Sequence, residues 1–265
     1  MFRILFSIII LWLIATVSMG FLHAEWEVVS GEYSSVSGEP RKPKPIPRPR
    51  EKETRLIELR GGLTKPTYIL REFSDDASTL RFVSRDVPLT DEDYKPENLM
   101  RIAGDNINEA GRVWYLRGDA HVALGELAQA FSREFQTPLV VISGYRSAAY
   151  QRQLWARENY CTETLCALPG RSEHQLWLAI DVFDATNEHD FIANRNYQRY
   201  VAWFQANAHL YGWHQSYQKW VEVDGYMVEP WHWRYVWVDM ATRLHNLGWT
   251  YTEYVEFQNW LIQYW

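Results

Sequence analysis

The stretch Leu139-Val-Val-Ile-Ser-Gly-Tyr-Arg-Ser147 gives the strongest local prediction in the chain. Its apolar run, Leu139–Ile142, follows Pro138 and has the length and β-branched content of a buried strand. The polar residues that come next turn the chain, and Ser147 can cap a helix that carries Leu154. We therefore expect a strand that leads through a turn into a helix.

Regular elements are expected on both sides of this stretch. Upstream, Asp119 can cap a helix whose apolar residues, from Leu124 to Phe135, recur at helical spacing. Strand-like runs at 56–59 and 68–70 lie in an N-terminal extension. Because strands and helices mix without a regular βαβ rhythm, we predict an α+β fold with a small antiparallel sheet flanked by helices. Downstream, the pattern predicts strands over 178–183, 213–217, 226–228 and 233–238, a helix that ends near Gly212, and two helical stretches flanking Gly248.

Composition places the chain among ordinary globular proteins and removes several functional classes. Of its 265 residues, 47% are hydrophobic and 23% are charged, which excludes a wholly disordered or fibrous protein. The net charge of -6 argues against nucleic acid as a partner. Two cysteines are too few for a disulfide-dense domain or a four-cysteine zinc site.

The N-terminus predicts export. A basic start precedes an apolar run from Ile4 to about Leu22, which is typical of a signal peptide, with an uncleaved membrane anchor as the alternative. We assign residues 1–24 to this segment and residues 25–54 to a Pro-rich basic linker, because alternating prolines favour an extended spacer. Residues 55–83 form the N-terminal extension, and the main domain with its C-terminal helices follows. The protein is expected in the periplasm or cell envelope, tethered to the inner membrane if the segment is not cleaved.

Two further segments bring histidines and acids together: Ser172-Glu-His-Gln-Leu-Trp-Leu-Ala-Ile-Asp181 and Glu229-Pro-Trp-His-Trp-Arg234. His174, His232 and a carboxylate would make a three-ligand site that leaves zinc one open position for water. A further carboxylate beside that water could act as general base. Asp181 would be a lone charge on an apolar strand face, which requires either an arginine partner or a metal. Spacing alone leaves both zinc binding and ordinary surface or core histidines open.

Together with Ser143–Ser147, these segments resemble the signature of the VanY-like zinc D-alanyl-D-alanine carboxypeptidases, a family related to D-Ala-D-Ala dipeptidases and to the hedgehog metal-site fold. Asp93–Leu99 is similar to a motif near the start of the family's domain, so the likeness covers about residues 84 to 240. The resemblance implies that residues 84–265 form a zinc peptidase domain with the metal site at the sheet. It assigns His174, Asp181 and His232 as zinc ligands, Glu229 as catalytic base, Arg146 as a catalytic and substrate-binding residue, and Gln151 and Ser172 as substrate-binding residues.

The function that this resemblance implies is zinc-dependent removal of a terminal D-Ala from peptidoglycan stem peptides, with either D,D- or L,D-specificity. An endopeptidase or dipeptidase of the same fold is one alternative. A non-catalytic, zinc-stabilised module that binds peptidoglycan is another, although a purely structural zinc site would need no free base such as Glu229. Ser216-Tyr-Gln-Lys219 matches the S-x-x-K pattern of serine penicillin-binding enzymes, but the sequence contains no K-T-G partner and no H-E-x-x-H motif.

Trp177 departs from the family pattern, which has glycine there, and Trp237 stands where the family often has glycine. An indole cannot cheaply adopt the positive φ that is open to glycine. We therefore expect the chain between His174 and Asp181 to take a different path, or the ring to point out of the cleft. The ring would either cover one wall of the substrate pocket or pack against a neighbouring tryptophan.

Cys161 and Cys166 are expected to form a disulfide. Export would place them in an oxidising compartment, and the sequence contains no other cysteine. Thr162 and Thr164 favour a break in helical structure, which lets two residues five positions apart approach each other. The bridge would fix the loop that leads toward His174.

Overall fold

The computed structural model describes residues 67–158, 160–185 and 188–264, and all of them lie within one compact unit, Glu53–Trp265. The predicted signal or anchor, the linker and the expected strand at 56–59 therefore fall outside the described residues. Within the described ranges, no helix is both long and apolar enough to span a bilayer.

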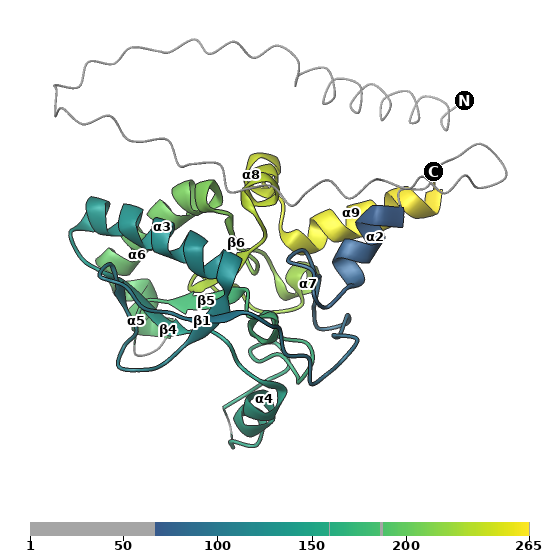
Figure 1. Ribbon diagram of the computed structural model, residues 1–265, viewed down its shortest axis with the longest axis horizontal. Helices are drawn as coiled ribbons and strands as arrows, with labels where there is room; N and C mark the ends of the chain where they lie inside the picture. The colour runs from purple at the N-terminus through teal and green to yellow at the C-terminus, as the bar shows by residue number, and fades with distance from the viewer. Residues whose placement is uncertain (1–66, 159, 186–187, 265) are drawn as a thin grey trace, which may run out of the picture. The chain divides into compact units, whose positions relative to one another are not determined.

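A five-stranded sheet forms the centre of this unit (Figure 1). β2 pairs with β4 in parallel, and the other neighbouring pairs of this sheet are antiparallel. A separate antiparallel pair joins β1 (Leu99–Arg101) to β3 (Tyr115–Arg117). The α+β prediction is confirmed, with one parallel pair where a purely antiparallel sheet was expected. The order of the large sheet is β2 (Ile107–Asn108), β4 (Leu139–Ser143), β5 (Ala179–Val182), β7 (His232–Tyr235) and β6 (Trp213–Gln215).

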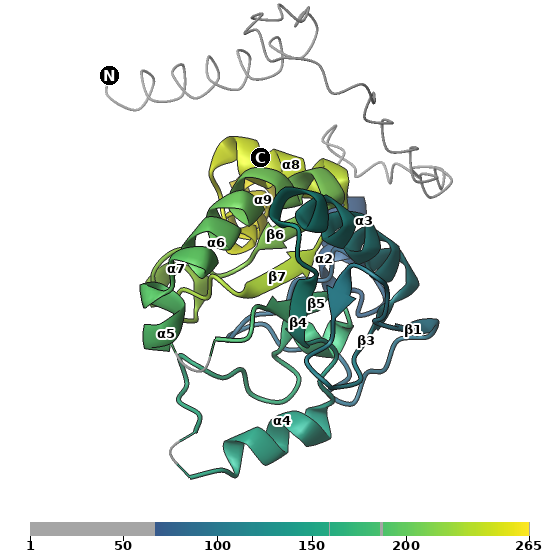
Figure 2. The ribbon, with the colours of Figure 1, turned by 90° about the vertical axis from the view of Figure 1, so that its left-hand side faces the viewer.

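Helices lie on both sides of the sheet. α3 (Gly118–Phe135) and α6 (Arg195–Asn207) lie on one side, whereas α4 (Ala148–Trp155) projects on the opposite side (Figure 1, Figure 2). Apolar side chains from the sheet, α3 and α6 form the main core, which explains the helical spacing of apolar residues in α3. Fully buried members of this core include Leu124, Leu127, Phe131, Ile180 and Phe204.

The starts of α4 and α3 differ in how well sequence predicts them. Ser147 caps α4 as predicted, because its hydroxyl accepts a hydrogen bond of 3.1 Å from the Tyr150 amide. The predicted cap of α3 is wrong: Arg117 is the N-cap residue, and Asp119 lies inside the first turn. The Asp119 carboxylate accepts a hydrogen bond of 3.1 Å from the Thr79 hydroxyl. A contact with the distant extension therefore occupies the side chain that was expected to cap the helix.

A second core holds the N-terminal extension against the C-terminal helices. Phe73 of α2 (Thr67–Ser74) packs edge-on against Tyr251, with ring centroids 6.1 Å apart, in α9 (Tyr251–Tyr264). The strand expected at 68–70 is wrong, because these residues lie in α2. Three apolar residues in a row do not distinguish strand from helix, and packing against α9 selects the helix. α8 (Val238–Leu247) and α9 flank Gly248 as predicted.

The remaining elements are η1 (Glu173–Leu176), α5 (Glu188–Ala193), η2 (Ala208–Tyr211) and α7 (Val221–Asp224). Beyond η2 the chain turns at Gly212 as predicted, where φ is 80° and a Cβ would lie 2.7 Å from the Tyr235 ring. The strand expected at 226–228 is wrong. The Met227 amide donates to the Thr164 carbonyl at 2.9 Å and does not join the sheet.

Candidate active site

Three predicted ligand side chains come together at the middle of the sheet. Asp181 of β5 and His232 of β7 are directly opposite each other in the strand register, and η1 brings His174 beside them. Asp181 Oδ1 lies 3.2 Å from His174 Nε2 and 3.2 Å from His232 Nδ1. The three ligand atoms all lie within 4.8 Å of one another, and all three residues are buried. Two imidazoles and one carboxylate in this arrangement fit a catalytic zinc site that keeps one position open.

The second ring nitrogen of each histidine is held by a fixed partner. His174 Nδ1 lies 2.7 Å from the Gly144 carbonyl, which can only accept, so Nδ1 carries the proton and Nε2 is left to face Asp181. In His232 the arrangement is reversed, because Nε2 lies 2.9 Å from a carboxylate oxygen of Glu173 and Nδ1 faces Asp181. This is how protein histidines are usually oriented to bind a metal.

The surroundings of the three side chains set their protonation states. Burial, with the charge of Arg146 nearby, lowers the pKa of His174 to about 4 and keeps this imidazole neutral. Burial also opposes a charge on His232, but hydrogen bonds to Asp181 and Glu173 raise its pKa to about 10. Although burial opposes ionisation of Asp181, the two histidines hold its pKa well below the usual range. Asp181 is therefore ionised and His174 keeps a free nitrogen, whereas a metal would have to displace the proton on His232.

Glu229 lies beside this cluster without being one of its three ligands. Its Oε2 is 3.8 Å from His232 Nδ1, and its backbone amide donates to the Tyr217 carbonyl at 3.0 Å. The His232 amide donates to the Glu229 carbonyl at 3.1 Å, so the segment around Pro230 bends and both side chains reach one site. Burial raises the pKa of Glu229 to about 7. A carboxylate with a pKa near neutrality is suited to both accepting and releasing a proton.

Arg146 approaches the cluster from the turn that follows β4. Its Nη2 lies 3.7 Å from Asp181 Oδ2, and its side chain remains 23% exposed. Its Nε is buried and has no hydrogen-bond partner among the described residues. The guanidinium therefore offers an unused donor beside the candidate ligands.

Gln151 and Ser172, the other expected substrate-binding residues, are both buried. Gln151 Nε2 donates to the Ala167 carbonyl at 2.6 Å, and its Oε1 has no partner among the described residues. Ser172 is the N-cap residue of η1 but makes no side-chain hydrogen bond to that helix. Gln151 thus ties α4 to the segment after Cys166 and keeps one acceptor unpaired.

The structure joins Cys161 and Cys166 in a disulfide whose Cα atoms lie 5.3 Å apart. The loop that it closes contains Thr164, whose carbonyl accepts the hydrogen bond from Met227. Met227 lies two residues before Glu229. The disulfide loop is therefore in contact with the segment that carries the candidate base.

The ring of Trp177 packs against Tyr145, with centroids 3.6 Å apart and the planes stacked, and Trp177 is only 3% exposed. The expectation that an indole avoids a positive φ here is wrong: Trp177 itself adopts the left-handed conformation, with φ 62° and ψ 29°. Trp237 also has a positive φ, at 68°. Both tryptophans therefore take up backbone conformations that favour glycine. The stacking partner of Trp177 is a tyrosine from the predicted turn, where a tryptophan was expected.

Glu173 is the residue of the site that sequence analysis missed. It is 3% exposed and lies between His232, Ser216 and Arg234. Burial alone would raise its pKa, but the hydrogen bond with His232 and the charge of Arg234 lower it to about 2. The available signal was an acid next to His174 in a segment that otherwise reads as a buried turn and strand.

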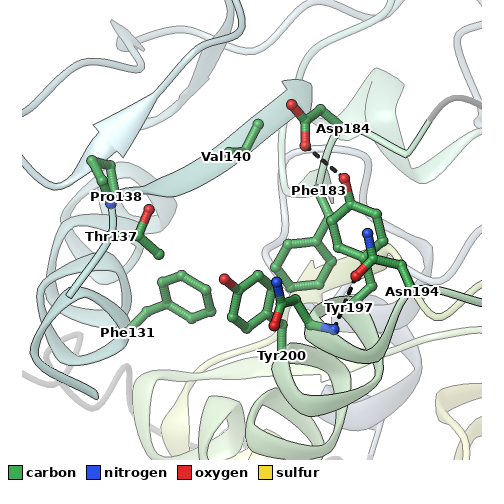
Figure 3. Close-up of a pocket in the computed structure, with 10 residues that line it drawn as sticks. Phe131, Thr137, Pro138, Val140, Phe183, Asp184, Asn194, Tyr197 and Tyr200 are labelled. Atoms are coloured by element: carbon green, nitrogen blue, oxygen red, sulfur yellow. Dashed lines mark hydrogen bonds between the residues drawn. The ribbon is translucent and has the colours of Figure 1, made fainter. Parts of the chain in front are cut away.

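A cavity of about 240 Å³ lies elsewhere, between the ends of β4 and β5 and helix α6 (Figure 3). Tyr197 donates to Asp184 at its rim with an O–O distance of 2.9 Å. None of the candidate ligands contributes to the wall of this cavity, so it is separate from the candidate active site. It is lined by Phe131, Thr137, Pro138, Val140, Phe183, Asp184, Asn194, Asn196, Tyr197 and Tyr200.

An α+β domain whose sheet carries a buried His-Asp-His cluster beside a glutamate has the composition of a metal-dependent hydrolase. The sequence model of the VanY family, D-alanyl-D-alanine carboxypeptidase, matches residues 114–238. VanXYC of Enterococcus gallinarum, a bifunctional D-Ala-D-Ala dipeptidase and carboxypeptidase, is 30% identical over 188 residues, which cover 68% of this chain and 95% of that protein. The chain belongs to the VanY family of D-alanyl-D-alanine carboxypeptidases.

Other relatives match over different lengths. A D-alanyl-D-alanine carboxypeptidase of Enterococcus faecalis is 32% identical over 131 residues, 44% of this chain, and the match spans about half, 47%, of that relative. The solved structure of the LdcB LD-carboxypeptidase has a TM-score of 0.59 at 27% identity and covers 76% of this chain and 92% of its own. A VanY D,D-pentapeptidase mutant from a VanB-type resistance cassette, in complex with Zn(II), has a TM-score of 0.51 at 27% identity, with coverages of 67% and 98%.

Proposed function

We propose that this chain is a zinc-dependent carboxypeptidase that removes a terminal D-Ala from peptidoglycan stem peptides. The observation that carries the proposal is the cluster of His174, Asp181 and His232, whose ligand atoms lie within 4.8 Å of one another beside the buried Glu229. A VanY relative is described in complex with Zn(II), and curated relatives are named for action on D-Ala-D-Ala. These comparisons support both the metal and the class of substrate.

The residues of the cluster divide the chemistry between them. His174 Nε2, His232 Nδ1 and a carboxylate oxygen of Asp181 would hold zinc, which when bound polarises the scissile carbonyl and lowers the pKa of a water molecule. Glu229 accepts the proton of the attacking water and delivers it to the leaving amine. Its burial suits this role, because a carboxylate with a raised pKa accepts a proton more readily, and a pKa of about 7 still lets it release that proton near neutral pH.

Arg146 is placed to select a substrate by its terminal carboxylate. Its buried Nε has no partner among the described residues, and its Nη2 faces Asp181. A guanidinium presents donors in a fork that matches a carboxylate. A terminal carboxylate bound by the exposed part of this side chain would place the last peptide bond near Glu229 and the ligands.

Metal removal tests the proposal directly. Purified protein should contain about one zinc ion per chain, the number that one three-ligand site holds. It should release D-Ala from a synthetic stem peptide, lose that activity when a chelator strips the metal, and regain it when zinc is returned. A metal-free preparation that kept full activity would contradict the proposal, and zinc-loaded protein that binds the peptide without releasing D-Ala would favour the non-catalytic module.

Three substrates separate the remaining alternatives: a pentapeptide ending in D-Ala-D-Ala, a tetrapeptide ending in an L-residue followed by D-Ala, and the free D-Ala-D-Ala dipeptide. A D,D-carboxypeptidase cleaves the first and an L,D-carboxypeptidase cleaves the second, as the name of LdcB indicates for that protein. Cleavage of the free dipeptide would indicate a dipeptidase activity like the one named for VanXYC.

We also propose that the protein acts in the periplasm or cell envelope. The support is the basic start and apolar run of residues 1–24. Cell fractionation followed by N-terminal sequencing tests this. A mature N-terminus near residues 20–24 would show cleavage, an intact chain in the membrane fraction would show a tether, and a cytoplasmic chain would contradict export.

A further inference from the structure

A cluster of buried polar side chains contacts the ring nitrogen of His232 that does not face Asp181. Glu173 and Ser216 are each 3% exposed, and Arg234 is fully buried. Glu173 Oε2 lies 2.9 Å from His232 Nε2 and accepts a hydrogen bond of 2.6 Å from the Ser216 hydroxyl. Its other oxygen lies 3.4 Å from Arg234 Nη1. Three partners thus hold the carboxylate in one orientation.

Arg234 links this carboxylate to the N-terminal extension. Its Nη2 donates to the carbonyls of Thr79 and Arg81, at 2.9 and 3.0 Å. Arg81 is itself fixed by Asp76, since its Nε lies 2.7 Å from Asp76 Oδ1 and both side chains are at most 9% exposed. These residues of the extension lie before the part of the chain that the family model matches, residues 114–238.

We propose that Glu173 is a positioning residue for the metal ligand His232, and that Arg234 and the segment 76–81 hold Glu173 in place. This inference rests on the proposed zinc function. A carboxylate that accepts from the second nitrogen of a ligating imidazole fixes the orientation of the ring and makes its free nitrogen a better donor to the metal. Arg234 supplies the opposite charge that a buried carboxylate needs.

The same geometry gives a role to Ser216, the first residue of the S-x-x-K match. Its hydroxyl donates to Glu173 Oε2 at 2.6 Å, and it is 3% exposed. A serine used in this way orients a carboxylate and is closed off from substrate. The serine of the S-x-x-K match, Ser216, therefore helps to position Glu173 at the proposed metal centre and is not a nucleophile.

Zinc affinity, measured by chelator competition, tests the positioning role. Glu173→Gln keeps the shape of the side chain but removes its charge, and we expect zinc binding about 10- to 100-fold weaker than in the wild type. Asp224→Asn is the matched control, because Asp224 is also a buried carboxylate, 1% exposed, but accepts from the amides of Gln218 and Lys219. Its zinc affinity should stay at the wild-type value. Thermal unfolding of each protein after metal removal shows whether the fold is retained.

The link to the extension needs variants of its own. Arg234→Lys keeps the positive charge, but one ammonium group cannot reach Glu173 and the carbonyls of Thr79 and Arg81 at the same time. Zinc binding should therefore weaken. Asp76→Asn loosens Arg81 without touching the cluster and should produce a smaller loss of the same kind. The visible spectrum of the cobalt-substituted protein reports ligand geometry and should change in Glu173→Gln and Arg234→Lys but not in the Asp224 control.

The outcomes separate this inference from the proposed function. If wild-type protein takes up no zinc, the proposed function fails. If the wild type binds zinc and Glu173→Gln binds it equally well, the positioning role is overturned while the proposed function stands. An equal loss in Asp224→Asn would also overturn it, because the effect would then follow from general loosening. If Arg234→Lys does not fold, Asp76→Asn decides the link, and unchanged affinity there would overturn it.

Discussion

Trp177 tests whether a large side chain holds a backbone conformation that favours glycine. Its φ of 62° and ψ of 29° cost a residue other than glycine about 1–2 kcal/mol. Its indole is only 3% exposed, and removing a buried tryptophan costs about 3–5 kcal/mol. Trp177→Ala loses the ring and keeps the strain, so it should lose about 3–5 kcal/mol of stability. Trp177→Gly loses the ring but relieves the strain, so its loss should be about 2–3 kcal/mol.

The comparison between the two variants isolates the backbone contribution. At a position with ordinary helical or strand backbone, glycine is less stable than alanine by about 0.5–1 kcal/mol. Here the order should be reversed, with the glycine variant about 1 kcal/mol more stable. Urea unfolding with zinc in excess measures both free energies under the same stabilisation by ligand. An alanine variant as stable as the glycine variant would refute the left-handed conformation at this position.

The same glycine variant addresses substrate choice. Because the ring is buried against Tyr145, we expect it to support the turn that carries Arg146 without contacting substrate. Relative kcat/KM for the three peptides should therefore stay constant while stability falls. A changed order of preference would show that the indole forms part of the substrate pocket, as sequence analysis had suggested.

The remaining predictions concern the base, a buried histidine and the disulfide. Glu229→Gln should keep its zinc but lose about 100-fold or more in kcat, whereas His232→Ala should lose the metal; near-normal turnover in Glu229→Gln would exclude this residue as the base. Burial lowers the pKa of His214 from 6.5 to about 4, so the unfolded chain takes up a proton first as pH falls. Stability should then drop by up to about 3 kcal/mol between pH 6.5 and pH 4, and the pH profile of urea unfolding should be flatter in His214→Asn; an equal slope would contradict this. Cys161 and Cys166 should become accessible to alkylation only after reduction, which intact-mass analysis detects, and two thiols without reductant would show that no bridge forms.

Local chemistry was enough to predict several elements around the candidate site. The β-branched run of β4 and the Ser147 cap of α4 are short-range signals, and both are present in the structure. Asp181, with its charge on an apolar strand, was correctly placed on the strand β5. The elements that were predicted wrongly depend on distant partners. α2 is helical where it packs on α9, and Met227 bonds to the disulfide loop.

Glu173 shows a different limit of sequence reasoning. Its carboxylate acts through Ser216, His232 and Arg234, which lie 43, 59 and 61 residues away along the chain. A pattern search detects residues at fixed short spacing, so it finds the histidine next to Glu173 but gives the acid itself no role. The fold creates that role, because it places η1 next to β7, so that Glu173 contacts His232.

Two tryptophans, Trp177 and Trp237, have a positive φ although glycine is the residue that favours it. The rule that positive φ requires glycine rests on a strain of about 1–2 kcal/mol per residue. Burial of an indole contributes more than this, about 3–5 kcal/mol as judged from its removal. Trp177 is 3% exposed and stacks on Tyr145, so its packing outweighs its strain. Trp237, at φ 68° and ψ 154°, packs against Tyr235 with ring centroids 5.4 Å apart. Residue type predicts local backbone conformation only where no such packing competes. At Trp177, between His174 and Asp181, the free energy gained by burying the ring exceeds the strain of the positive φ, so the packing determines the backbone conformation.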